Sequence, residues 1–324
     1  MLTSYAFFGA LEQGFVFGLM VLGVYLTFRV LDFPDLTVDG SLPLGAAVSS
    51  VAITAGYPPV VSVVFAALAG FCAGAVTGLL NTRLKILHLL ASILTMIALY
   101  SINIRIMGRP NMTLLGKDTV LDPITALGIP GFYASPLLFG VIAVLLAGGL
   151  IWFLHTEFGQ TMLSTGDNPQ MSRAMGVDVN SMIVFGVGLS NALVATAGAL
   201  IAQNQGAADV NMGVGTIVAG LASVIVGETL LGVGPGKVKR AVIAALVGSI
   251  VYRLAIAVAL SLKIGNFSFS PSDLNLITTL IIFQGSVTNP TPLQKIKIQK
   301  KIKPGAEKKK PEKNCFFGGK LCYK

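Results

Sequence analysis

The chain has few charged residues and few side chains that bind metals. Only 11% of its 324 residues are charged, 54% are apolar, and the mean hydropathy is +0.79. These proportions exclude an ordinary water-soluble domain. The only histidines, His88 and His155, stand far apart, and the cysteines Cys72, Cys315 and Cys322 fit no common zinc spacing. We therefore expect neither a metal site nor a cofactor.

A nucleotide-binding loop is also missing. Such a loop reads G-x-x-x-x-G-K-[ST], so that backbone N–H groups surround the phosphates. The nearest match is centred on Gly236 and Lys237. Leu231 stands where the first glycine belongs, and Val238 replaces the Mg²⁺-binding hydroxyl. No pair of acid and base groups, and no activated nucleophile, stands out within the apolar segments. We predict that the chain is not an enzyme and that any ATP hydrolysis occurs on another chain.

Long apolar stretches fill the sequence between residues 5 and 288. Each is about 17 to 25 residues long, enough to cross a hydrocarbon layer of about 30 Å as a helix. The sequence predicts an all-α polytopic membrane domain over residues 1–290, whose first span begins at the N-terminus without a removable signal. The nine predicted spans are 5–28, 38–56, 58–80, 86–106, 136–155, 179–203, 213–233, 240–262 and 272–288. The second is weak, because Asp39, Ser41 and Pro43 stand at its start.

The positive charge lies in the tail. Residues 291–324 carry 11 Lys and 2 Glu, whereas the preceding residues carry 12 basic and 12 acidic side chains. We expect a disordered Lys-rich cytoplasmic tail that is either simply solvated or in contact with anionic lipid headgroups. Nucleic-acid binding is not expected.

Basic residues also predict the orientation. If the N-terminus is outside, the inner loops and the tail collect 18 Lys and Arg residues, and the outer loops collect four. Basic residues concentrate on the cytoplasmic side of membrane proteins. The sequence thus favours nine spans with the N-terminus out and the C-terminus in.

The inner connection 156–178 contains a short predicted helix. Asn168 is a good N-cap, Pro169 suits the first helical position, and Gly176 suits the stop. Met171 and Met175 share one face with Ala174 by helical spacing. This face either fits a groove on a partner, where methionine adapts to imperfect pockets, or lies on the chain's own membrane domain.

Two ladders of small residues recur at every fourth position. Such ladders let helices approach closely, either for static packing or along a seam that slides between two copies. The first is Ser62, Ala66, Gly70, Gly74 and Gly78, and the second is Gly215, Ala219, Ser223 and Gly227.

Polar groups inside spans are costly and therefore informative. Glu228 and Arg253 differ in predicted depth by about 10 Å, which makes a direct ion pair between them doubtful. Each either reaches the interface or a carbonyl group, or Glu228 holds an inner gate. Asn191, with Gln203, Asn204 and Gln205 at the outer end of the same span, either contacts a passing solute or bonds neighbouring helices.

Four motifs together resemble one family. They are Gly166-Asp167-Asn168 followed by Arg173-Ala174-Met175-Gly176-Val177, the stretch from Ser190 to Leu200, the stretch from Gly220 to Glu228, and the segment from Phe33 to Ser41. Over about residues 5–288 the chain resembles the branched-chain amino acid and sugar permeases of bacterial ABC importers. The segment from Phe33 to Ser41 is similar to the tryptophan/tyrosine-type branch.

The resemblance implies a translocation subunit in the bacterial inner membrane. Its expected partners are a second permease copy, identical or not, a cytoplasmic ABC ATPase dimer and an extracytoplasmic substrate-binding protein. The segment 166–176 would dock on the ATPase, and the outer connection 107–135 would face the binding protein. The expected solute is an amino acid, with an aromatic one favoured. A sugar or nucleoside permease and an ion-driven secondary transporter are the alternatives.

Overall fold

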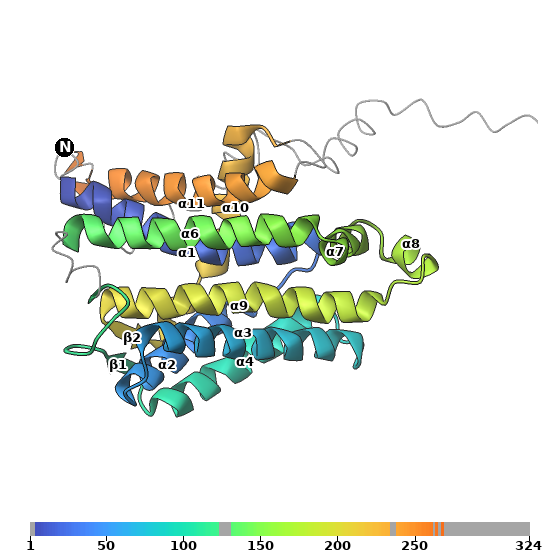
Figure 1. Ribbon diagram of the computed structural model, residues 1–324, viewed down its shortest axis with the longest axis horizontal. Helices are drawn as coiled ribbons and strands as arrows, with labels where there is room; N and C mark the ends of the chain where they lie inside the picture. Colours follow the sequence, from blue (N-terminus) through green and yellow to red (C-terminus); the bar gives the residue numbers. More distant parts are fainter. Residues whose placement is uncertain (1–3, 123–130, 234–237, 262, 265–266, 269–324) are drawn as a thin grey trace, which may run out of the picture. The chain divides into compact units, whose positions relative to one another are not determined.

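The chain folds as a bundle of helices (Figure 1). The computed structural model describes residues 4–122, 131–233, 238–261, 263–264 and 267–268, which fall within one compact unit, residues 1–285. Among the described residues, seven helices are long and apolar enough to cross a membrane. The predicted all-α membrane architecture is confirmed to that extent. The ninth predicted span, 272–288, and the tail, 291–324, lie outside the described residues.

The long helices follow seven of the predicted apolar stretches. Most of their ends lie within about two residues of the prediction, because apolar composition sets where a span begins and ends. They are α1 (Ser4–Tyr25), continued by the π-helical turn η1 (Leu26–Val30), α3 (Pro59–Thr82), α4 (His88–Met107), α6 (Gly131–His155), α9 (Val179–Gln205), α10 (Thr216–Leu231) with the turn before it, and α11 (Val238–Ser261).

The remaining elements are short and connect or interrupt the spans. They are α2 (Val38–Thr54), α7 (Glu157–Asp167), α8 (Pro169–Ala174), the 3-10 turn η2 (Val210–Gly213), and the strands β1 (Asn111–Thr113), β2 (Ala207–Asp209), β3 (Lys263–Ile264) and β4 (Phe267–Ser268). Strands β1 and β2 pair antiparallel, with Asn111 opposite Asp209. Figure 1 shows this pair at one end of the bundle and α8 at the other.

The first small-residue ladder packs α3 closely against α9. A Cβ on Gly70 would collide with the backbone of Asn191, and one on Gly78 would come within 2.7 Å of the Val184 Cα. Gly74 lies against the Val187 carbonyl in the same way. Such contact brings two backbones together and gives the dispersion contacts that hold helices together in lipid.

Helix α2 begins partway along the bundle instead of at its end. Asp35, just before α2, lies beside Asn191 in the middle of α9, whereas Ser49 near its end bonds Gln203 near the end of α9. The two helices therefore run in the same direction, and the N-terminus of α2 lies well inside the length of α9. At 17 residues, α2 spans about 25 Å, which is short of a full crossing.

Helix α10 also begins inside the bundle. After α9, the chain passes through β2 and η2, and Gly213 lies against the backbone of Asp39 and the ring of Pro43 at the start of α2. Gly215, with φ +78°, then turns the chain into α10. This left-handed conformation favours glycine. The first turns of α2 and α10 are therefore neighbours.

The second ladder joins α10 to α11. Gly227 lies against the Ala244 carbonyl of α11, and Gly248 lies against the Ser223 carbonyl of α10. Ala219 packs beside the small cluster that contains Tyr252. The glycines of both ladders, apart from Gly215, thus pack against neighbouring helices of the same chain.

Candidate functional site

Helix α8 stands at one end of the bundle and is capped as its sequence predicts. The Asn168 side chain accepts hydrogen bonds from the backbone N–H groups of Gln170 and Met171, each at 3.1 Å. Pro169 is the first helical residue, and Gly176 has φ +87°, which ends the helix. The caps hold six residues in a helix that would not form alone.

The face of α8 predicted to contact a partner is open. Met171 is 61% exposed and Met175 is 74% exposed. Ala174 and Arg173 are also exposed, and Ser172 alone points into the protein. The two exposed methionines and the alanine thus form a small apolar surface beside one positive charge, a combination common in docking sites.

Helix α7, which was not predicted from the sequence, connects α8 to the bundle. Thr156 caps its start, accepting a hydrogen bond from Gly159 at 3.3 Å. Gly166, near its end, lies directly against the backbone of Val30 in η1, where a Cβ would collide with the carbonyl oxygen. Asp167, which follows, is exposed. The segment 166–176 therefore contacts η1 at one end and is free at the other.

Asp178 is the N-cap of α9, at the end of the connection from α8. Its carboxylate accepts hydrogen bonds from the Ser181 hydroxyl at 2.6 Å and from the Asn180 backbone N–H at 3.1 Å. The Ser181 hydrogen bond lowers the pKa of Asp178 below its ordinary value, so this carboxyl is ionised at neutral pH. Its charge lies at a helix N-terminus, where it is favourable.

The last turn of α10 is tied to η1 by an ion pair. The Arg29 Nε donates to the Glu228 Oε1 at 2.8 Å, and the Arg29 Nη2 contacts the other carboxylate oxygen. From the predicted depths of the two residues, a direct ion pair between Arg253 and Glu228 was doubtful. Arg253 instead places its guanidinium 3.5 Å from the centroid of the Phe17 ring, a cation–π contact.

Asn191 belongs to a buried polar network. Its Nδ2 donates to Asp35 at 2.7 Å and to the Val187 carbonyl at 2.9 Å. Asp35 also accepts from the Thr37 backbone N–H at 2.9 Å, and the Thr37 hydroxyl lies 3.0 Å from the Thr77 hydroxyl. These bonds join the segment before α2 to α3 and α9, so Asn191 bonds neighbouring helices.

Gln203 and Asn204 also bond within the chain. The Gln203 amide donates to the Ser49 and Ser62 hydroxyls at 3.0 and 3.1 Å, and its carbonyl accepts from the Val120 backbone N–H at 3.1 Å. Asn204 donates to Glu12 on α1. Of the four residues predicted for the translocation path, Asn191, Gln203 and Asn204 thus bond other elements of the bundle, and the fourth, Glu228, pairs with Arg29.

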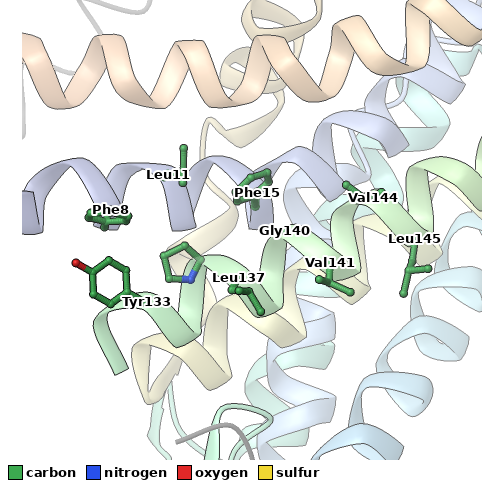
Figure 2. A pocket seen from close by; sticks show the side chains of 10 residues that line it. Phe8, Leu11, Phe15, Tyr133, Leu137, Gly140, Val141, Val144 and Leu145 are labelled. Atoms are coloured by element: carbon green, nitrogen blue, oxygen red, sulfur yellow. The ribbon is translucent and has the colours of Figure 1, made fainter. Parts of the chain in front are cut away.

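An apolar groove of about 570 Å³ lies between α1 and α6. Figure 2 shows side chains of both helices that line it, including Phe8, Phe15, Tyr133 and Leu137. Its lining is almost wholly apolar, and Phe8 and Tyr133 meet edge to face at 5.1 Å between ring centroids. Polar groups that would orient a solute are too few here, so the groove suits acyl chains.

A second cavity, of about 360 Å³, lies between the first turns of α2, helix α4 and the turn that precedes α10. It has polar lining groups, Asp39 of α2 and Asn103 of α4. The carboxylate of Asp39 accepts the backbone N–H groups of Gly215 at 3.1 Å and Ile217 at 2.9 Å, and thereby caps α10. From the sequence, Asp39 was predicted to interrupt the second span and belongs to the motif from Phe33 to Ser41, but no capping role was predicted for it. Three polar residues within five positions, Asp35, Thr37 and Asp39, are the signal that could have found this junction.

Comparison with known proteins identifies the class. Residues 6–284 match the family described as "Branched-chain amino acid transport system / permease component", and the chain belongs to this family. It is therefore the permease component of an ABC-type transport system for amino acid or sugar-like solutes, and a multi-pass protein of the bacterial inner membrane.

Three individual relatives show how far the similarity extends. The tyrosine transport system permease protein of Clostridioides difficile is 38% identical over 93% of this chain and 97% of its own length. An uncharacterized protein of Rickettsia prowazekii is 30% identical over 85% of this chain and 94% of its own. The autoinducer 2 import system permease protein LsrC of Yersinia pseudotuberculosis is 31% identical over 53% and 48%, respectively. No solved structure gives a significant match.

Proposed function

We propose that this chain is the membrane-spanning subunit of an ATP-driven importer for an aromatic amino acid. The observation that carries the proposal is the similarity to the C. difficile tyrosine permease, which extends over nearly the whole of both chains. The LsrC relative shares only about half of each chain, so it supports the family more than the solute.

The proposed assembly has three kinds of subunit. Two permease copies, identical or not, form the membrane core, an ATPase dimer binds in the cytoplasm, and a binding protein delivers the solute from outside. The ATPase docks on α8 through Met171, Ala174 and Met175, the exposed apolar face beside Arg173. In this arrangement the N-terminus and the β1–β2 end face outward, and the tail is cytoplasmic.

A continuous set of contacts would carry force from the ATPase to the transport path. Movement of α8 displaces α7, whose Gly166 lies on the Val30 backbone of η1. Arg29 in η1 holds Glu228 at the end of α10, and the other end of α10 is capped by Asp39. We propose that this set switches the permease between outward-open and inward-open states, each favoured by a different ATPase conformation.

Uptake into proteoliposomes tests the function. The chain is reconstituted with its ATPase and binding-protein partners, and uptake of labelled tyrosine is compared with that of ribose. We expect tyrosine uptake that needs internal ATP and survives ionophores. Uptake without ATP that collapses with ionophores would establish an ion-driven transporter, and uptake of ribose alone would establish a sugar permease.

Cysteine labelling in intact cells tests the orientation. Arg173→Cys on α8 and Leu115→Cys beside β1 are made in a chain whose own cysteines are replaced by serine; both positions are exposed, at opposite ends of the bundle. An impermeant maleimide should label position 115 in intact cells and position 173 only after the membrane is opened. The reverse pattern would overturn the orientation and the docking role of α8 together.

A further inference from the structure

The cavity between the start of α2, helix α4 and the turn before α10 has the size and chemistry of a solute site. Its volume, about 360 Å³, lies within the range of small-ligand pockets. Residues of these three elements line it, including Asp39, Tyr100, Asn103 and Val214. Many secondary transporters bind their solutes beside helices that are interrupted inside the membrane, and α2 and α10 both begin inside the bundle next to this cavity.

Asn103, which lines the cavity, has an unused hydrogen-bond acceptor. The residue is fully buried, and its Nδ2 donates to the Gly40 carbonyl at 3.2 Å. This bond fixes the orientation of the amide, because a carbonyl can only accept. The Asn103 Oδ1 is buried and has no hydrogen-bond partner in the described part of the chain. Buried polar atoms are nearly always paired, so the structure leaves a place for a donor.

Asp39 supplies a negative charge on the same wall. Its carboxylate accepts three hydrogen bonds from the start of α10, from Gly215, Thr216 and Ile217. A carboxylate offers about four acceptor positions, so one is left. Asp39 is partly exposed, and none of the described residues lining the cavity is Lys, Arg or His. The site therefore favours a cation that donates hydrogen bonds and disfavours a carboxylate.

The rest of the lining is apolar and includes an aromatic ring. Tyr100 belongs to α4, as do Met96 and Ile97, and Pro43 belongs to α2. Aromatic and sulfur-containing side chains pack favourably against an aromatic ring, and the face of a tyrosine also attracts an ammonium group. These surroundings suit a small molecule with one ammonium group and one ring.

We propose that this cavity binds the ammonium end of the transported solute, with Asp39 and the Asn103 Oδ1 as its acceptors and with Tyr100 and Met96 against its side chain. The proposal rests on the proposed function, because it takes the solute to be an aromatic amino acid. It goes further in naming the site and the group that is recognised there. The carboxylate of the amino acid would lie away from Asp39.

Binding to the purified full-length chain in lipid nanodiscs tests the site. The probes are tyrosine, tyramine, which lacks the carboxylate, and 4-hydroxyphenylpropionate, which lacks the amine. We expect tyrosine and tyramine to bind and the acid not to bind. Asn103→Leu keeps the branched shape of the side chain but removes the acceptor, together with the donor to the Gly40 carbonyl. It should weaken tyramine binding by about tenfold, since hydrogen bonds to charged groups are the stronger ones.

The matched control is Ser50→Ala. The Ser50 hydroxyl is another buried oxygen without a partner among the described residues, but Ser50 does not line this cavity. Its replacement should leave tyramine affinity unchanged. Failure of the unaltered chain to bind tyramine, binding of the acid as tight as that of tyramine, or equal affinities in the Asn103→Leu and unaltered chains would each overturn the proposal.

Charged thiol reagents provide a second readout that does not depend on Asp39, whose loss removes the cap of α10. Asn103→Cys is made in the chain without its own cysteines and treated with an ammonium-bearing or a sulfonate-bearing methanethiosulfonate. We expect faster reaction with the ammonium reagent and protection by tyramine. Equal rates without protection would contradict the site.

These measurements separate the inference from the proposed function. Tyramine binding needs no ATPase, so it can stand even if uptake proves independent of ATP. If ATP-driven tyrosine uptake is found and Asn103→Leu changes neither binding nor uptake, the proposed function stands and the site assignment fails.

Discussion

Arg29 and Glu228, 199 positions apart in the chain, form an ion pair that fastens η1 to the last turn of α10. Arg29 is 44% exposed at its side chain and Glu228 is 17% exposed. The pair lies next to Val30, on which α7 rests. The ion pair therefore connects η1, which α7 contacts, directly to α10.

Replacing Glu228 with Gln should remove this link without changing the shape of the side chain. Because the Arg29 side chain is partly open to solvent, which screens the pair, the coupling in a double-mutant cycle with Arg29→Gln should be about 0.5 to 1 kcal/mol. Thermal unfolding in detergent gives the stability of each variant. Arg240→Gln, at another exposed arginine, is the control and should leave stability unchanged. A coupling of zero would show that the pair does not fasten α10.

A negative charge on the open face of α8 should disconnect transport from ATP hydrolysis. Ala174→Asp places a carboxylate between Met171 and Met175, where docking would bury it without a partner. We expect loss of ATPase copurification and of ATP-driven uptake, with normal membrane insertion. Leu115→Asp, at the opposite end of the bundle, should retain the ATPase. Normal uptake by Ala174→Asp would remove α8 from the docking surface.

Removing the N-cap of α8 should destabilise the helix, and a replacement at position 168 that can still accept the two hydrogen bonds should not. Asn168→Ala deletes the acceptor for Gln170 and Met171, and loss of an N-cap costs about 0.5 to 2 kcal/mol. Amide hydrogen exchange of residues 169–175 should accelerate accordingly. Asn168→Asp, which can still cap, should exchange at nearly the original rate. Identical exchange in the Ala variant and the unaltered chain would contradict the capping role.

The close contact of α3 with α9 gives a matched pair of glycine substitutions. Gly70→Ala forces a Cβ into the backbone of Asn191 and should destabilise the protein by about 1 to 3 kcal/mol. Gly149→Ala on α6 meets no described atom within 4 Å and should be neutral or slightly stabilising. Unfolding temperatures of the two variants in detergent decide the matter. Equal effects would mean that α3 can move away from α9 at little cost.

The sequence predicted what depends on local composition. Apolar length located the long helices, and the types of Asn168, Pro169 and Gly176 predicted the caps of α8, because capping depends on residues within one turn. The partner of Glu228 was missed, since an ion pair between residues so far apart depends on how η1 and α10 pack. For the same reason, composition could not show that α2 starts beside Asn191, or that Asp39 caps a helix more than 170 positions later.

The glycine contacts of α9 reach beyond the ladder on α3. Gly198 of α9 lies on the Leu42 backbone of α2, and Gly45 of α2 lies on the Ala195 backbone of α9. At these glycines the three helices meet backbone to backbone, and sliding there would cause steric overlap. We therefore expect α2, α3 and α9 to move together as one frame during a transport cycle, with the larger rearrangements in the helices around them.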